Sequence, residues 1–160
     1  MNSGKTRMTL DFVRLTVDRR SEEVAVLDLA PETTRGIGGK MVPPPHPLIA
    51  YYTTKVIPPR LTGRDEEEVE SYSLRNAREI ERLFSEYLKR PRGVLVINDV
   101  SLYLQGGRLE RLMEVLRPSH TAVINGYYGK ALGEGPLSRR ERSRMDRLAA
   151  LCDRVIRLEP

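Results

Sequence analysis

The stretch VLVIND, residues 94–99, carries the clearest structural signal in the sequence. Four apolar residues, Val94 to Ile97, are followed directly by Asn98 and Asp99. A short continuous apolar run is typical of a strand that is buried on both faces, as in a parallel sheet. The sequence therefore predicts a buried strand over Val94 to Ile97, with two polar side chains at its carboxyl end.

Three further apolar runs predict strands of the same kind. VAVLDL at 24–29 precedes Ala30 and Pro31, Thr121 to Ile124 precedes Asn125, and Val155 to Leu158 is the last run in the chain. Ligands of open parallel sheets bind beyond the carboxyl ends of the strands. The polar residues expected at those ends, and therefore the first candidate site residues, are Asp28, Asp99 and Asn125.

Segments with helical spacing of apolar residues lie between these runs. The predicted helices cover Lys5 to Arg19, Asp65 to Arg90, Leu109 to Leu116 and Ser138 to Leu151. In the last of them, Ser138 followed by Glu141 has the spacing of a capping box. The alternation of helix and strand predicts an α/β fold, a three-layer sandwich in which helices flank a mostly parallel sheet. Its 160 residues fit one domain, 1–160.

Residues 31–64 break this alternation because they are rich in proline and glycine. They contain GIGGK at 36–40 and PPPHP at 43–47, with one short extended piece expected over Tyr51 to Ile57. The pattern predicts a long loop insertion, and a loop of this length in a compact domain is often functional.

Composition limits the classes of function. The net charge is +5 and the pI about 9.6, which is compatible with a nucleic-acid partner without requiring one. A single cysteine, Cys152, excludes an intramolecular disulfide and a cysteine-based zinc site. No apolar run approaches the ~20 residues that cross a bilayer. Because residues 1–6 are polar and unlike a signal peptide, we expect a cytoplasmic protein with no membrane partner.

The start of the chain carries the most specific motif. Gly4, Lys5 and Thr6 supply the last three positions of G-x-x-x-x-G-K-[ST], and a predicted helix follows at once. In such a loop, backbone N–H groups and the positive end of the helix cradle phosphate oxygens. Lys5 would reach the β- and γ-phosphates, and the Thr6 hydroxyl would bind Mg²⁺. The residues expected to hold the nucleotide are Asn2, Ser3, Gly4, Lys5, Thr6 and Arg7.

The first glycine of that motif and the strand that normally precedes it would lie upstream of Met1. The sequence therefore indicates a chain that begins inside its own phosphate loop and lacks the first strand, which is central in folds of this kind. The alternative is that Gly4-Lys5-Thr6 occurs by chance near a frayed terminus.

Together with the strand ends, these residues give the chain a resemblance to the P-loop NTPase superfamily over nearly its whole length. The resemblance implies that Asp99 is the Walker B acid beside Mg²⁺ and that Asn125 senses the γ-phosphate. Val100 stands where the branch with an extra strand between the phosphate-loop and Walker B strands has a catalytic glutamate, which argues against vigorous hydrolysis. The guanine-specifying Asn-Lys-x-Asp motif is absent, which favours ATP as the nucleotide.

Asp28 resembles the acid that activates water or a substrate hydroxyl in deviant P-loop ATPases and in RNA 5′-end polynucleotide kinases. An aspartate before a proline also occurs for turn reasons alone. The glycines of 36–40 with Lys40 either cradle a second phosphate or form a flexible turn. Tyr127 and Tyr128 either stack on a base or are ordinary loop residues. His46 and His120 are isolated, so no metal beyond nucleotide-bound Mg²⁺ is expected.

The arginines of the last helix allow two interpretations. Arg139, Arg140, Arg142 and Arg144 either include one that neutralises transition-state charge or form a solvated helix face. The leading hypothesis is an ATP-binding, Mg²⁺-dependent NTPase that acts by hydrolysis or phosphoryl transfer, with Lys5, Asp28, Asp99 and Asn125 as its catalytic residues. The rivals are a regulatory or assembly module that binds nucleotide without fast hydrolysis, and an arginine-rich nucleic-acid binder. A homo-oligomer is a further expectation.

Overall fold

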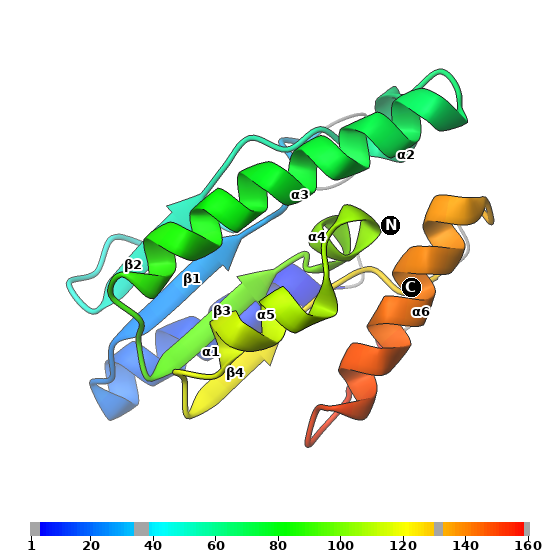
Figure 1. The fold of residues 1–160 in the computed structure, drawn as a ribbon. Coiled ribbons are helices and arrows are strands. Elements are labelled where there is room, and N and C mark those ends of the chain that lie inside the picture. The colour runs from blue at the N-terminus through cyan, green and yellow to red at the C-terminus, as the bar shows by residue number, and fades with distance from the viewer. Residues whose placement is uncertain (1–3, 34–38, 130–132, 159–160) are drawn as a thin grey trace.

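The computed structural model describes residues 4–33, 39–129 and 133–158, and it has an α/β fold (Figure 1). The helices are α1 (Lys5–Arg20), α2 (Pro59–Thr62), α3 (Glu66–Leu88), α4 (Ser101–Gly106), α5 (Leu109–Leu116) and α6 (Pro136–Ala150). The strands are β1 (Val24–Asp28), β2 (Ile49–Thr53), β3 (Val94–Asn98) and β4 (Thr121–Ile124).

The four strands form one sheet in the order β2-β1-β3-β4, and every neighbouring pair is parallel. Val24 lies beside Val94, and Val94 beside Thr121, so β1, β3 and β4 start level with one another. Every residue of the two inner strands, β1 and β3, is buried, as expected for a parallel sheet covered on both faces. The predicted parallel sheet flanked by helices is thus confirmed.

The two faces of the sheet carry separate apolar cores because side chains alternate along a strand. On one face, Val24, Val26, Val94 and Val96 pack with Val13 and Val17 of α1 and with Met41. On the other face, Ala25, Leu27, Leu95 and Ile97 pack beneath α3, α4 and α5. In Figure 1, α1 lies behind the sheet and α3, α4 and α5 in front of it, whereas α6 stands to one side and packs on α4.

Local sequence explains where the longest helix begins. The Asp65 carboxylate accepts a hydrogen bond from the Glu68 N–H at 2.8 Å, and three glutamates follow in the first turn of α3. Both features stabilise the positive amino end of a helix. The helix predicted over Asp65 to Arg90 is therefore confirmed, with Asp65 as its cap.

Two helices, α2 and α4, were not predicted, and both lie where apolar periodicity is weak. The segment 31–64 is not one long loop, because it contains the single turn α2 and also β2, which overlaps the extended piece expected over Tyr51 to Ile57. Helix α4 is buried on nearly every side, including its polar residue Gln105, so it shows no apolar stripe.

Two predictions are wrong. Residues 155–158 form no strand, and Val155 and Ile156 are more than half exposed. The apolar run has no strand beside it to pair with in the described part of the chain. The capping box also fails: α6 begins at Pro136, with Gly135 as its cap, so Ser138 lies inside the first turn.

The outer edge of β4 is unpaired within the described residues, because β4 is the last strand in the sheet order. The described sheet has no central gap, since β1, β3 and β4 are direct neighbours. No described helix is long and apolar enough to cross a membrane.

Candidate functional site

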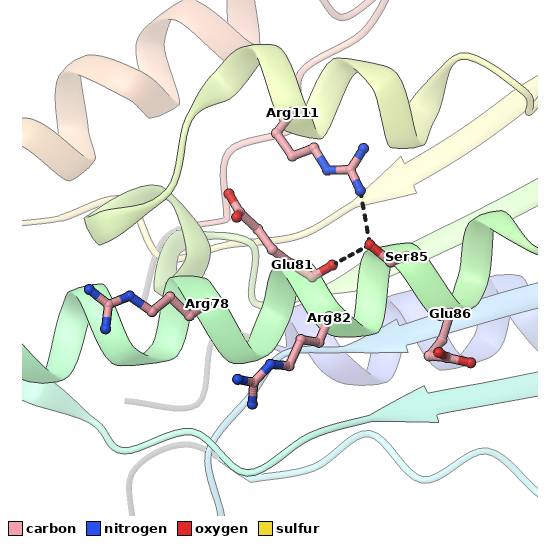
Figure 2. A pocket seen from close by; sticks show the side chains of 6 residues that line it. All are labelled: Arg78, Glu81, Arg82, Ser85, Glu86 and Arg111. Atoms are coloured by element: carbon pink, nitrogen blue, oxygen red, sulfur yellow. Dashed lines mark hydrogen bonds between the residues drawn. The ribbon is translucent and has the colours of Figure 1, made fainter.

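One surface hollow, of about 450 Å³, lies between α3 and α5 (Figure 2). Its lining residues are Arg78, Glu81, Arg82, Ser85, Glu86 and Arg111. Arg82 pairs with Glu79, and Arg111 donates to Ser85 and pairs with Glu114. Because those arginine charges are matched by neighbouring carboxylates, the hollow is a mixed-charge surface rather than an anion site.

The carboxyl ends of β1, β3 and β4 meet at one edge of the sheet, where their polar side chains form a hydrogen-bonded chain. Asn125 Nδ2 donates to Asn98 Oδ1 at 2.9 Å, and Asn98 Nδ2 donates to Asp28 Oδ1 at 2.8 Å. The structure therefore brings together Asp28, Asp99 and Asn125, as the strand ends predicted. We call these residues, with Thr9 and Ser101, the strand-end cluster: Thr9, Asp28, Asn98, Asp99, Ser101 and Asn125.

Asp28 is fully buried, and both of its carboxylate oxygens accept hydrogen bonds. Oδ2 accepts from the Met41 N–H at 2.5 Å and from the Tyr51 hydroxyl at 2.7 Å. Burial raises the pKa of Tyr51, and its bond to Asp28 adds to that rise, so the hydroxyl stays a donor. In this arrangement Asp28 anchors the connection between β1 and β2 rather than facing solvent.

Asn125 connects β4 to two other elements. Its Oδ1 accepts from the Asp99 N–H at 2.9 Å, and its Nδ2 donates to Thr9 Oγ1 at 2.9 Å. Thr9 Oγ1 in turn donates to the Lys5 carbonyl at 2.8 Å. The first turn of α1 is therefore held to the end of β3 through the Asn125 amide.

Asp99 has a left-handed backbone, with φ of 60°. Left-handed geometry at a non-glycine residue costs about 1–3 kcal/mol and is concentrated at functional sites. The Ser101 hydroxyl donates to Asp99 Oδ1 at 2.5 Å. Burial raises the pKa of the Asp99 carboxyl, whereas the Ser101 bond and the charges of Lys5 and Arg60 act against that rise.

The amino end of α1 faces this cluster. Gly4 precedes the helix with φ of 72°, and among the described residues no side chain caps the helix there. Lys5 is partly buried, whereas Thr6 and Arg7 are exposed. Asn2 and Ser3, which were expected to contribute to the loop, lie outside the described residues.

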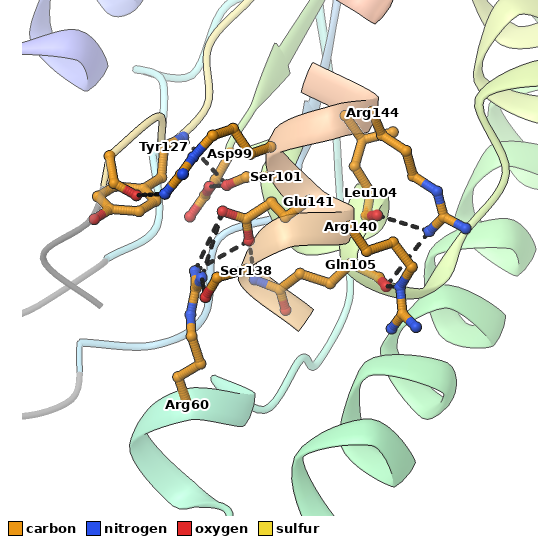
Figure 3. Close-up of polar contacts among 12 residues, drawn as sticks. Arg60, Asp99, Ser101, Leu104, Gln105, Tyr127, Ser138, Arg140, Glu141 and Arg144 are labelled. Atoms are coloured by element: carbon orange, nitrogen blue, oxygen red, sulfur yellow. Dashed lines mark hydrogen bonds and ion pairs between the residues drawn. The ribbon is translucent and has the colours of Figure 1, made fainter. Parts of the chain in front are cut away.

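A second polar group lies next to Asp99 (Figure 3), and sequence reasoning missed two of its members, Arg60 and Gln105. Arg60 of α2 donates to Ser138 at 3.0 Å and pairs with Glu141 at 3.0 Å, and both side chains of the pair are nearly buried. Gln105 donates to Glu141 at 2.5 Å. We call this group the helix cluster: Arg60, Gln105, Ser138, Arg140 and Glu141.

The arginines of α6 are mostly engaged by neighbouring helices. Arg140 donates to the Gln105 carbonyl at 2.6 Å, and Arg144 donates to the Leu104 carbonyl at 2.8 Å (Figure 3). Arg139 donates to the Glu134 carbonyl, and Arg142 to the Gly129 carbonyl. Arg140 and Arg144 therefore fasten α6 to α4, and the arginine that lies beside Asp99 is Arg60.

The remaining candidate residues lie around the same edge of the sheet. Tyr127 lies under Arg60, with the guanidinium carbon 5.5 Å from the ring centroid, whereas Tyr128 is exposed and donates to Asp146. Lys40 is partly buried and donates to the Thr54 carbonyl at 2.9 Å. Burial lowers the pKa of Lys40, and the carboxylates of Asp28 and Asp99 oppose that change. The glycines at 36 and 38 lie outside the described residues.

Among the described residues, no group of three or more His, Cys, Asp or Glu side chains could hold a metal ion. Comparisons with protein-family models, with curated proteins and with solved structures give no match.

Proposed function

We propose that the chain binds ATP together with Mg²⁺ at the amino end of α1, beside the strand-end cluster. One observation carries the proposal. The turn that starts at Gly4 is connected to the backbone of Asp99 through Lys5, Thr9 and Asn125. A phosphate-binding turn and a metal-binding carboxylate are thereby held in a fixed relation to each other.

The amino end of α1 has the features of a phosphate site. The N–H groups that point outward from the first turn of a helix, together with the helix dipole, favour an anion at such an end. No described atom beyond its chain neighbours lies within 4 Å of the position that a Cβ on Gly4 would take, so the described residues leave room at this glycine. Lys5 supplies a positive charge close enough to affect Asp99.

The residues present also fit Mg²⁺. This ion prefers oxygen ligands and is usually held by one or two carboxylates, water and the phosphates of the substrate. Asp99 would supply the carboxylate and Thr6 the hydroxyl. The Ser101 hydroxyl engages Asp99 Oδ1, so Oδ2 is the oxygen that would bind the ion. When bound, the ion would neutralise phosphate charge.

The reaction that follows binding is either hydrolysis or phosphoryl transfer, and one observation favours slow turnover. Val100, the residue after Asp99, is fully buried in the core. The position at which the related branch carries a catalytic glutamate therefore faces away from solvent. The second candidate function, a nucleotide-binding module without fast hydrolysis, rests on this observation. Asp28 as a base for phosphoryl transfer stays a prediction, since its carboxylate is buried and fully bonded.

The sheet topology gives the proposal a geometric requirement. Crossovers between parallel strands are right-handed in nearly all proteins. Helix α3 connects β2 to β3, helices α4 and α5 connect β3 to β4, and all three lie on the face opposite α1. If a strand led into Gly4 and α1, it would therefore lie on the β4 side of the sheet, along the edge of β4. There its carboxyl end would approach Asn125 and place the phosphate turn beside the strand-end cluster.

Isothermal titration calorimetry with ATP, with and without Mg²⁺, tests the proposal. Substitution Lys5→Ala should weaken binding about 10–100-fold, the effect of losing one charge-assisted hydrogen bond. The matched control is Lys89→Ala, an exposed lysine after α3 that pairs with Glu86. Phosphate release, measured alongside, distinguishes the enzyme from the module. Absence of ATP binding to the unaltered chain would overturn the proposal.

Titration with an oligonucleotide in place of ATP tests the nucleic-acid alternative. Binding of a single-stranded or duplex oligonucleotide, with affinity that falls steeply as salt rises, would favour it over the nucleotide site.

A further inference from the structure

Asp99 is held by two side chains that sequence motifs do not mark as a pair: Ser101 bonds its carboxylate, and Asn125 bonds its backbone N–H. Ser101 is almost completely buried, and its hydroxyl donates to Asp99 Oδ1 at 2.5 Å. The same hydroxyl oxygen accepts from the Tyr127 N–H at 3.2 Å (Figure 3). The orientation of the carboxylate is therefore connected to the loop that follows β4.

Asn125 acts on the backbone of the same residue. Its Oδ1 accepts the N–H of Asp99, whose left-handed φ of 60° turns the chain directly after β3. Both amide protons of Asn125 are engaged, one by Thr9 and one by Asn98. A side chain with all its groups in use is placed to fix geometry rather than to contact a ligand.

We propose that Ser101 and Asn125 are positioning residues that hold Asp99 so that its Oδ2 faces the phosphate turn of α1. Ser101 sets the rotation of the carboxylate by occupying Oδ1. Asn125 sets the left-handed backbone and the distance from Asp99 to the first turn of α1. This inference rests on the proposed function and assigns Asn125 a supporting role in place of direct γ-phosphate contact.

The chain offers matched controls for each substitution. Ser73 is a fully buried serine of α3 whose hydroxyl donates to the Glu70 carbonyl and accepts from Arg140. Asn76 is a buried asparagine whose amide makes two hydrogen bonds to the backbone of Ile57. These residues lose comparable hydrogen bonds on truncation, but neither contacts the strand-end cluster in the described structure.

The test measures Mn²⁺ binding by electron paramagnetic resonance in the presence of a non-hydrolysable ATP analogue, and affinity for the analogue without metal. Substitutions Ser101→Ala and Asn125→Ala should each weaken Mn²⁺ binding about 10–100-fold, as loss of residues that orient a metal ligand does. For Ser101→Ala, metal-free affinity should change less than about twofold. Ser73→Ala and Asn76→Ala should leave both affinities unchanged, whatever they do to the melting temperature.

Crystal structures of the same variants give a readout that does not depend on binding. The Asp99 carboxylate should rotate in Ser101→Ala, and the Asp99 backbone should leave the left-handed region in Asn125→Ala. Unchanged Mn²⁺ affinity in both variants, or an unchanged Asp99 in both structures, would overturn the inference. If the unaltered chain bound neither Mn²⁺ nor the analogue, the proposed function would fail, and the variant structures alone would decide the positioning roles.

Discussion

The strand-end cluster and the helix cluster are both polar, largely buried and close together, yet they are built differently. In the helix cluster a buried arginine and a buried glutamate neutralise each other directly, at 3.0 Å. In the strand-end cluster, amides and hydroxyls hold the carboxylates, and Asp99 has no salt bridge within the described residues. A paired charge fastens helices, whereas an oriented but unpaired carboxylate is available for a ligand.

The largest expected effect is on stability, from breaking the ion pair of the helix cluster. Glu141→Ala leaves the Arg60 charge buried without its partner, which should lower the free energy of unfolding by about 3–5 kcal/mol. Urea denaturation measures this change. The control Glu68→Ala, which breaks an exposed pair with Arg64, should change stability little. A small loss in Glu141→Ala would mean that the helix cluster does not fasten the helices.

The next substitution lies in the strand-end cluster and tests the role of Asp99 as a metal ligand. Asp99→Asn keeps the side-chain shape and a residue type that tolerates left-handed backbone. It should abolish Mg²⁺ dependence of ATP binding, with an effect larger than the about 10–100-fold expected for a supporting residue. Calorimetric titration of ATP at several Mg²⁺ concentrations measures it. Retained Mg²⁺ dependence would remove Asp99 from the metal site.

The Asp99 carboxyl should also give the unaltered chain a pH dependence of stability that Asp99→Asn lacks. Because the folded-state pKa of Asp99 is raised above its usual 3.8, the folded chain binds the proton more tightly than the unfolded chain. The contribution of Asp99 to stability should therefore fall as pH rises from about 3.8 through the raised pKa, and then stay constant. Subtracting the pH–stability curve of Asp99→Asn from that of the unaltered chain isolates this trend. A difference that increases with pH over that window would contradict it.

The smallest expected effect concerns the anchor at Asp28. Tyr51→Phe removes one donor from a buried carboxylate that keeps its bonds from Met41 and Asn98. A loss of about 1–2 kcal/mol in stability should follow, with ATP affinity unchanged. Thermal unfolding and titration together measure both quantities. A marked loss of ATP affinity instead would place Tyr51 and Asp28 in the reacting site.

The strand-end cluster was largely predictable, and the helix cluster was not. Short buried strands ending in polar residues can be recognised locally, and parallel pairing then brings Asp28, Asp99 and Asn125 to one edge. Arg60 and Glu141 are 81 positions apart, and no periodicity connects them. The apolar run 155–158 shows a different limit of prediction from sequence. Its residues are typical of a strand, but no described strand lies beside them to pair with.

The free edge of β4 has a consequence for handling the protein. An unpaired edge presents a row of backbone N–H and C=O groups that can template another chain. Strand β4 has no proline, lysine or other charge within Thr121–Ile124 to oppose such pairing, although it is only four residues long. Where no further strand covers this edge, the chain should therefore self-associate through it in concentrated solution, and the apolar side chains of Val155 and Ile156 would add to the tendency to aggregate.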